Sequence, residues 1–245
     1  MPAAEWERST APDVMAEFDI KTTYERGLDH HLLQGREWLR ASDEGERTAA
    51  VSYAALEFRF AIERLALHYW RILIDREPTH EELEKLRSFK AVEKKIYELA
   101  GHQREIDRHF EFMQIVTDAI QLPLRLQAPS ISTLSRHWHL CSELCHIDWP
   151  LTCSVKELRS EVFSTLGKVE ENLVLSVNSL AWPNIKDENF KSIRADYIAE
   201  RIGADHVRRH LHRIGVWACY KPPGDGEPQF VGVPIPEASE PSNIQ

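Results

Sequence analysis

Apolar side chains recur every three or four positions along two long stretches of the chain. The first stretch runs from about Arg47 to Ile74, and its apolar residues are spaced 4, 3, 4, 3, 4 and 3. A strand would alternate with a period of two, so this spacing predicts one unbroken amphipathic helix, with Arg59 and Glu63 as an i, i+4 ion pair. The apolar residues of this seam are Val51, Ala55, Phe58, Ile62, Leu65, Tyr69 and Ile72.

The second stretch runs from Ser154, a good N-cap residue, to Leu180. Two apolar seams of this length must be covered by neighbouring elements, which predicts a helical bundle. The second seam consists of Val155, Leu158, Val162, Leu166, Val169, Leu173, Val177 and Leu180.

Shorter helices are predicted between and after these two. Thr79 starts one with a capping side chain and an acidic first turn, and Gly101 ends the next. An apolar seam over 106–120 predicts another helix, and Ser130 opens a further one. After a break at Trp182-Pro183-Asn184, two short helices are expected over about 187–202 and 205–214, and an extended stretch over 216–220.

These elements predict an all-α fold, a multi-helix bundle with a small basic helical appendage at its C-terminal end. Residues 1–17 are polar and are expected to form a flexible arm, and residues 18–181 the bundle. The appendage is expected over 185–221. The segment 222–245 is rich in proline and glycine, which predicts a disordered tail.

Composition narrows the choice of function. The formal net charge of −9 disfavours a protein that coats nucleic acid with its whole surface. No signal peptide and no apolar run of about 18 residues is found, so we expect a cytoplasmic protein without membrane contact. The four cysteines, at positions 141, 145, 153 and 219, fit reduced thiols better than a disulfide framework.

Two clusters contain residue types that bind metals. His137, Cys141 and Cys145 fall one turn apart on one helix face, but the two cysteines also continue an apolar seam. Buried cysteine often packs as a small hydrophobe, so we expect core thiols. His206 and His210 form an i, i+4 pair whose basic neighbours disfavour a dication. No metal and no cofactor is therefore expected.

Two segments carry residue patterns that recur in a family of bacterial proteins. Residues 53–65, Tyr-Ala-Ala-Leu-Glu-Phe-Arg-Phe-Ala-Ile-Glu-Arg-Leu, look like the opening long helix of HEPN-type proteins. Residues 134–146, Leu-Ser-Arg-His-Trp-His-Leu-Cys-Ser-Glu-Leu-Cys-His, are similar to a later helix. The resemblance covers about residues 45–180. It implies a bundle of four or five helices that is frequently a dimer and often linked to RNA cleavage or RNA binding.

The nuclease signature of that family is an arginine, four to six residues and a histidine. Arg26–His31, Arg104–His109 and Arg201–His206 match it. Random placement gives about three such matches in a chain of this composition, so the signature does not select a catalytic pair. A HEPN-like bundle without that chemistry is therefore the preferred interpretation.

Residues 196–215 resemble a helix-turn-helix, with Ala199 and Gly203 placed to let two helices approach and turn, although the second helix starts about two residues early for the usual motif. Residues 191–222 hold seven Lys/Arg against three acids, a net +4 in a chain of −9. This local reversal of charge predicts contact with nucleic acid. The expected nucleic-acid-binding residues are Arg201, His206, Arg208, Arg209, His210 and Arg213.

We therefore expect a non-catalytic HEPN-like module that contacts RNA, DNA or a partner protein through residues 194–213. Protonation of His206 and His210 at mildly acid pH would strengthen binding to phosphate. The alternatives are a metal-independent RNase whose arginine and histidine come from different helices, and a purely structural oligomerisation module. A simpler interpretation of the appendage is that it caps the bundle and shows its basic side to solvent. We also expect a homo-oligomer.

Overall fold

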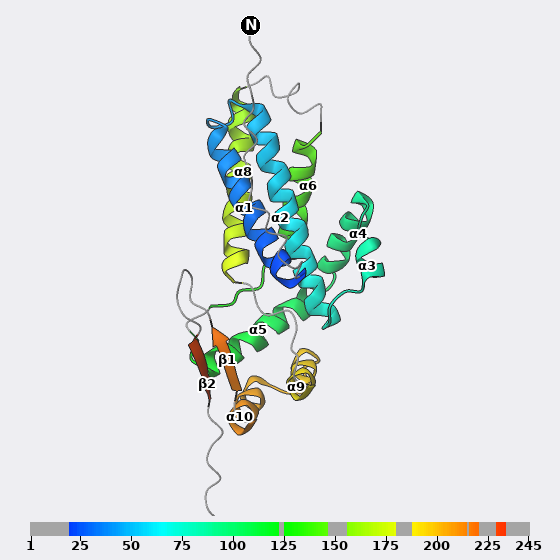
Figure 1. Cartoon of the computed structure of the whole chain (residues 1–245), viewed down its shortest axis with the longest axis vertical. Coiled ribbons are helices and arrows are strands. Elements are labelled where there is room, and N and C mark those ends of the chain that lie inside the picture. Colours follow the sequence, from blue (N-terminus) through cyan, green and yellow to red (C-terminus); the bar gives the residue numbers. More distant parts are fainter. Residues whose placement is uncertain are drawn as a thin grey trace, which may run out of the picture.

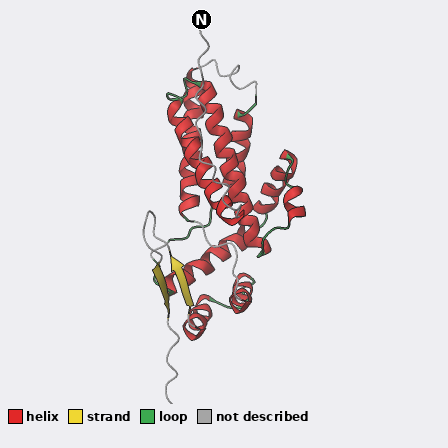
Figure 2. Cartoon of the chain, viewed as in Figure 1, coloured by secondary structure: helices red, strands yellow, loops and turns green. Residues whose placement is uncertain are grey.

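The computed structural model describes residues 20–122, 125–146, 156–179, 188–214, 216–220 and 229–233. It confirms the all-α multi-helix bundle, to which one short hairpin is added (Figures 1 and 2). None of the described helices is long and apolar enough to cross a bilayer. The helices are α1 (Ile20–Ala41), α2 (Thr48–Ile74), α3 (His80–Glu84), α4 (Phe89–Ala100), α5 (Gln103–Ala119), α6 (Ile131–Leu144), α8 (Lys156–Asn178), α9 (Glu188–Ile198) and α10 (Ala204–Ile214), and the strands are β1 (Val216–Tyr220) and β2 (Gln229–Val233).

Helix α2 is the central element of the bundle, and α1, α6 and α8 pack around it (Figure 1). It spans almost the predicted range, and all seven residues of its seam are buried. Burial of each large side chain of this seam contributes roughly 1.5–3 kcal/mol. Arg59 and Glu63 form the expected ion pair at 3.0 Å. The hydrophobic period therefore located the core helix correctly.

Helix α1 lies against α2, but the hydrophobic pattern alone does not single it out. Gly27 and Gly35 interrupt the sequence of this helix, and glycine is a poor helix former. The fold explains Gly35: a Cβ there would lie 2.4 Å from the ring of Phe58. The missing side chain therefore lets the two helices approach each other.

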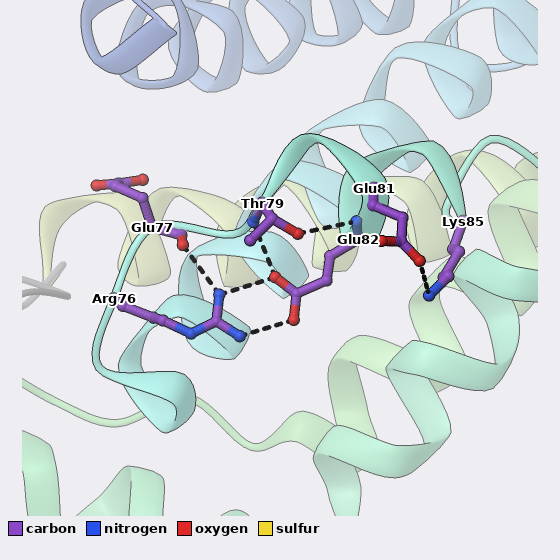
Figure 3. Close-up of polar contacts among 6 residues, drawn as sticks. All are labelled: Arg76, Glu77, Thr79, Glu81, Glu82 and Lys85. Carbon is purple, nitrogen blue, oxygen red and sulfur yellow. Dashed lines mark hydrogen bonds and ion pairs between the residues drawn. The ribbon is translucent and has the colours of Figure 1, made fainter.

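Helix α3 begins at the predicted capping residue (Figure 3). The Thr79 hydroxyl accepts a hydrogen bond from the Glu82 backbone N–H at 3.3 Å, and the Glu82 carboxylate accepts one from the Thr79 N–H at 2.8 Å. Arg76 donates to both carboxylate oxygens of Glu82, at 2.8 and 2.7 Å. The Arg76 guanidinium and the Thr79 N–H together lower the pKa of Glu82 to about 2. The loop between α2 and α3 is thereby fixed at the start of α3.

Helix α8 covers most of the second predicted stretch. Val162, Leu166, Val169 and Leu173 are buried as expected. Leu158 is not, with 38% of its surface exposed, because the seam reaches the bundle only one turn later. Ser154, Val155 and Leu180 lie outside the described residues.

Helix α5 crosses below the bundle and carries α9 and α10 on its far side (Figure 1). Buried residues of all three helices belong to the same continuous core as α2. The appendage expected over 185–221 is thus built on a helix that also contacts the bundle.

The hairpin pairs β1 antiparallel to β2, from Val216 opposite Val233 to Tyr220 opposite Gln229. The extended stretch predicted over 216–220 is confirmed. The prediction of disorder over 222–245 is wrong for 229–233, because Gln-Phe-Val-Gly-Val is rich in residues that favour strands. The predicted arm, residues 1–17, lies outside the described residues.

Candidate nucleic-acid interface

Helix α5 anchors α9 through two arginines on its first turns. Arg108 donates to the Tyr197 carbonyl at 3.0 Å, and its guanidinium lies 3.9 Å from the centre of the Tyr197 ring. Arg104 pairs with Glu200 at 2.6 Å, just after α9 ends. The C-terminal end of α9 therefore has a fixed position on α5.

Arg194 is the main correction to the predicted basic surface. It was expected within the contact region 194–213, but only 5% of its surface is exposed. Its guanidinium donates to His109 Nδ1 at 2.8 Å and to the Ile72 carbonyl at 2.6 Å, and it pairs with Asp75 at 3.1 Å. Arg194 lies on the apolar stripe of α9, one turn from Phe190 and Tyr197. It joins α9 to α2 and α5 and cannot reach a ligand outside.

The turn between α9 and α10 begins earlier than predicted. Helix α9 ends at Ile198 rather than at 202, because Glu200 adopts a left-handed conformation, with φ of 57°. The Glu200 N–H donates to the Tyr197 carbonyl at 3.0 Å and the Arg201 N–H to that of Asp196 at 2.9 Å, which is the Schellman pattern of helix termination. Gly203, expected to permit the turn, has open space where its Cβ would be.

Helix α10 has one buried and one exposed face. Val207 and Leu211 are fully buried, and the helix packs on α5 and α9. Since each residue turns the helix by about 100°, Arg209 projects roughly opposite to these two side chains. His206 and Arg213, at i−3 and i+4 from Arg209, are exposed beside it. The helix thus presents a stripe of three side chains that can carry positive charge.

Most other basic residues of the appendage already have acidic partners. Arg208 pairs with Asp205 at 2.9 Å, Arg201 with Asp196 at 2.6 Å, and Lys191 with Glu188 at 2.8 Å. Lys221 lies outside the described residues. Arg209 pairs with no acid in the part of the chain that the structure describes. Among the described residues of the appendage, the surface positive charge without an acidic partner is therefore that of Arg209 and Arg213.

His210 does not contribute in the expected way. It is half-buried, and its Nδ1 accepts a hydrogen bond from Arg213 at 2.9 Å. Burial and the neighbouring Arg213 lower the pKa of His210, so this side chain gains a proton in mild acid less readily than expected. His212, which was not among the predicted site residues, is exposed on α10 three residues after Arg209. The helical period could have found it.

The Arg–x4–His segments do not form shared sites where the structure describes them. Arg104 is exposed and paired with Glu200, while His109 is fully buried and accepts from Arg194. The two residues lie about 140° apart around α5. Arg201 lies in the turn before α10, where it pairs with Asp196. The side chain of Arg26 is outside the described part.

The candidate metal cluster on α6 divides between core and surface. Cys141 is fully buried as predicted, and burial raises the pKa of its thiol, which disfavours the thiolate that metals bind. Cys145 was predicted to be buried but is only half-buried, because α6 ends there. Its Sγ donates a hydrogen bond to the Cys141 carbonyl at 3.0 Å. In the described ranges, no three His, Cys, Asp or Glu residues are grouped so as to hold an ion.

Comparison with known proteins gives no match. No family model matches the chain, and neither a curated protein nor a solved structure is significantly similar to it. The geometry of α10 and of the helices that support it is therefore the basis for inferring a function.

Proposed function

We propose that this protein binds nucleic acid through the exposed face of α10, with the HEPN-like bundle as a non-catalytic scaffold. The observation that carries the proposal is the position of Arg209 opposite the buried stripe, without an acidic partner among the described residues and with His206 and Arg213 beside it. Asp205 is the one acid of α10, and Arg208 already pairs with it.

The anchoring of this face also supports the proposal. Hydrogen bonds from α5 side chains hold α9 in place. The buried side chains Val207 and Leu211 pack α10 against α5. A rigidly held helix orders few new groups when phosphate binds, so less of the interaction energy is lost to ordering. The RNase alternative, with an arginine and a histidine from different helices, has less support, because the contact of this kind between Arg194 and His109 is buried.

Salt-dependent binding tests the proposal. Fluorescence anisotropy of the full chain with labelled 30-mer duplex DNA, single-stranded DNA and RNA would be followed over a range of salt concentrations. For each phosphate of duplex DNA that the exposed face of α10 neutralises, log K should fall with log salt at a slope of about −0.9. Failure to bind any of the three at low salt would contradict the proposal and leave α10 as a structural cap.

A further inference from the structure

Helices α9 and α10 are arranged as a helix-turn-helix supported by a third helix. The Schellman termination at Glu200 directs the chain away from α9, and the Gly203 carbonyl accepts from the His206 N–H at 3.0 Å to start α10. Helix α5 packs against both. In such motifs the second helix enters the major groove and its N-terminal half meets the bases.

Unpaired nucleic acid fits this face poorly. Single strands are held by aromatic side chains on which the bases stack. Phe190, half-buried against Phe112 with ring centres 5.9 Å apart, and Tyr197, buried under Arg108, offer no free ring face. The exposed aromatic rings described in α10 are the imidazoles of His206 and His212. Double-stranded RNA is also disfavoured, because its major groove is too deep and narrow for a helix, whereas that of B-DNA admits one.

Arg209 is the side chain placed to read a base. Arg208 is held by Asp205, and Arg213 donates to His210 on its own helix. Arg209 lies at the centre of the outward face, and a free guanidinium there can donate two parallel hydrogen bonds to O6 and N7 of guanine. Arg213 lies one turn later on the same exposed side of α10.

We propose that α10 enters the major groove of double-stranded DNA and that Arg209 reads a guanine there. This inference rests on the proposed nucleic-acid binding and adds its substrate class and its specificity-determining residue.

Selection from a random duplex DNA library, with the full-chain protein, tests the inference. The enriched motif should contain one G·C pair whose replacement by A·T weakens binding about 5- to 150-fold. The Arg209→Ala variant should lose that preference, since alanine offers guanine no hydrogen-bond donor, while Arg213→Ala should keep it. Both substitutions lie at exposed positions, so circular dichroism should be unchanged.

The outcomes separate the inference from the function on which it rests. A guanine preference that depends on Arg209 supports both. Binding that favours single strands or duplex RNA, or a motif without an Arg209-dependent guanine, overturns the inference and leaves the proposed function standing. Failure to bind any nucleic acid at low salt overturns both.

Discussion

Two glycines of α1 differ sharply in what surrounds them. A Cβ on Gly35 would collide with the Phe58 ring, whereas the nearest atom to a Cβ on Gly27 is Arg64 Nε at 3.7 Å, an ordinary contact. Both residues are helical, so the backbone conformation is the same. Comparing the same substitution at Gly35 and at Gly27 therefore separates the effect of close helix packing from that of helix propensity.

Gly35→Ala should destabilise the protein by about 1–3 kcal/mol, because the Phe58 ring or the α1 backbone must shift in a filled core. Gly27→Ala should be neutral or stabilising by up to about 1 kcal/mol, since alanine is the better helix former. Urea unfolding of both variants measures this. Equal effects would mean that α1 does not lie as close to α2 as described.

The buried guanidinium of Arg194 is expected to stabilise the fold. Arg194→Met leaves the Asp75 carboxylate and the Ile72 carbonyl without their donor, at a cost of about 3 kcal/mol, because Asp75 is mostly buried. Arg201→Met is the matched control: its pair with Asp196 is exposed and should contribute no more than about 1 kcal/mol. The free energies of unfolding of the two variants give the comparison. Losses of similar size would place Arg194 at the surface.

At the scale of elements, periodicity and capping residues were informative where one helix face meets one layer of neighbours. The α2 seam, the Thr79 cap and the Ser130 cap, whose hydroxyl accepts from the Thr133 N–H, are found as predicted. The hydrophobic pattern does not predict the features that tertiary packing determines. Gly35 is a poor helix former until Phe58 lies beside it, and Leu158 extends a seam beyond the layer that could cover it.

The candidate site was predictable only in part, because charge in a sequence does not reveal burial or pairing. Arg209 and Arg213 are exposed, in agreement with the basic surface predicted from local composition. Arg194 could have been excluded, since it shares the stripe of Phe190, Ile193 and Tyr197, but its partners Asp75 and His109 are more than 80 residues away along the chain. The pairing of Arg208 with Asp205 is local and could have been anticipated.

Helices α6 and α10 each carry a histidine whose pKa burial lowers, His137 and His210. Between that lowered pKa and the ordinary imidazole value of about 6.5, the unfolded chain binds more protons than the folded chain. The free energy of unfolding should therefore fall as the pH decreases from about 6.5, until the folded-state pKa is passed.

Urea unfolding at pH 7.5 and pH 5.5 tests this pH dependence. The difference between the two pH values should be smaller in the double variant His137→Gln/His210→Gln than in the parent chain, because glutamine does not titrate. A difference as large in the variant as in the parent would assign the pH dependence to other groups.

For the whole molecule, one continuous core joins the bundle to the helices that carry the candidate interface. Leu211 of α10 and Tyr197 of α9 belong to the same buried cluster as Phe58 of α2. The buried Arg194 adds a polar connection at the same junction. The face of α10 is therefore presented by a rigid support.

The most direct measurement compares two charge-reversing double variants in the duplex-binding assay at low salt. Arg209→Glu/Arg213→Glu reverses two exposed charges at i, i+4 on α10. Lys90→Glu/Lys94→Glu makes the same change in net charge at the same spacing on the exposed face of α4. The account predicts that the α10 variant loses binding, that the α4 variant binds as the parent chain does, and that the circular dichroism of both is unchanged. Equal losses in the two variants, or full binding by the α10 variant, would contradict it.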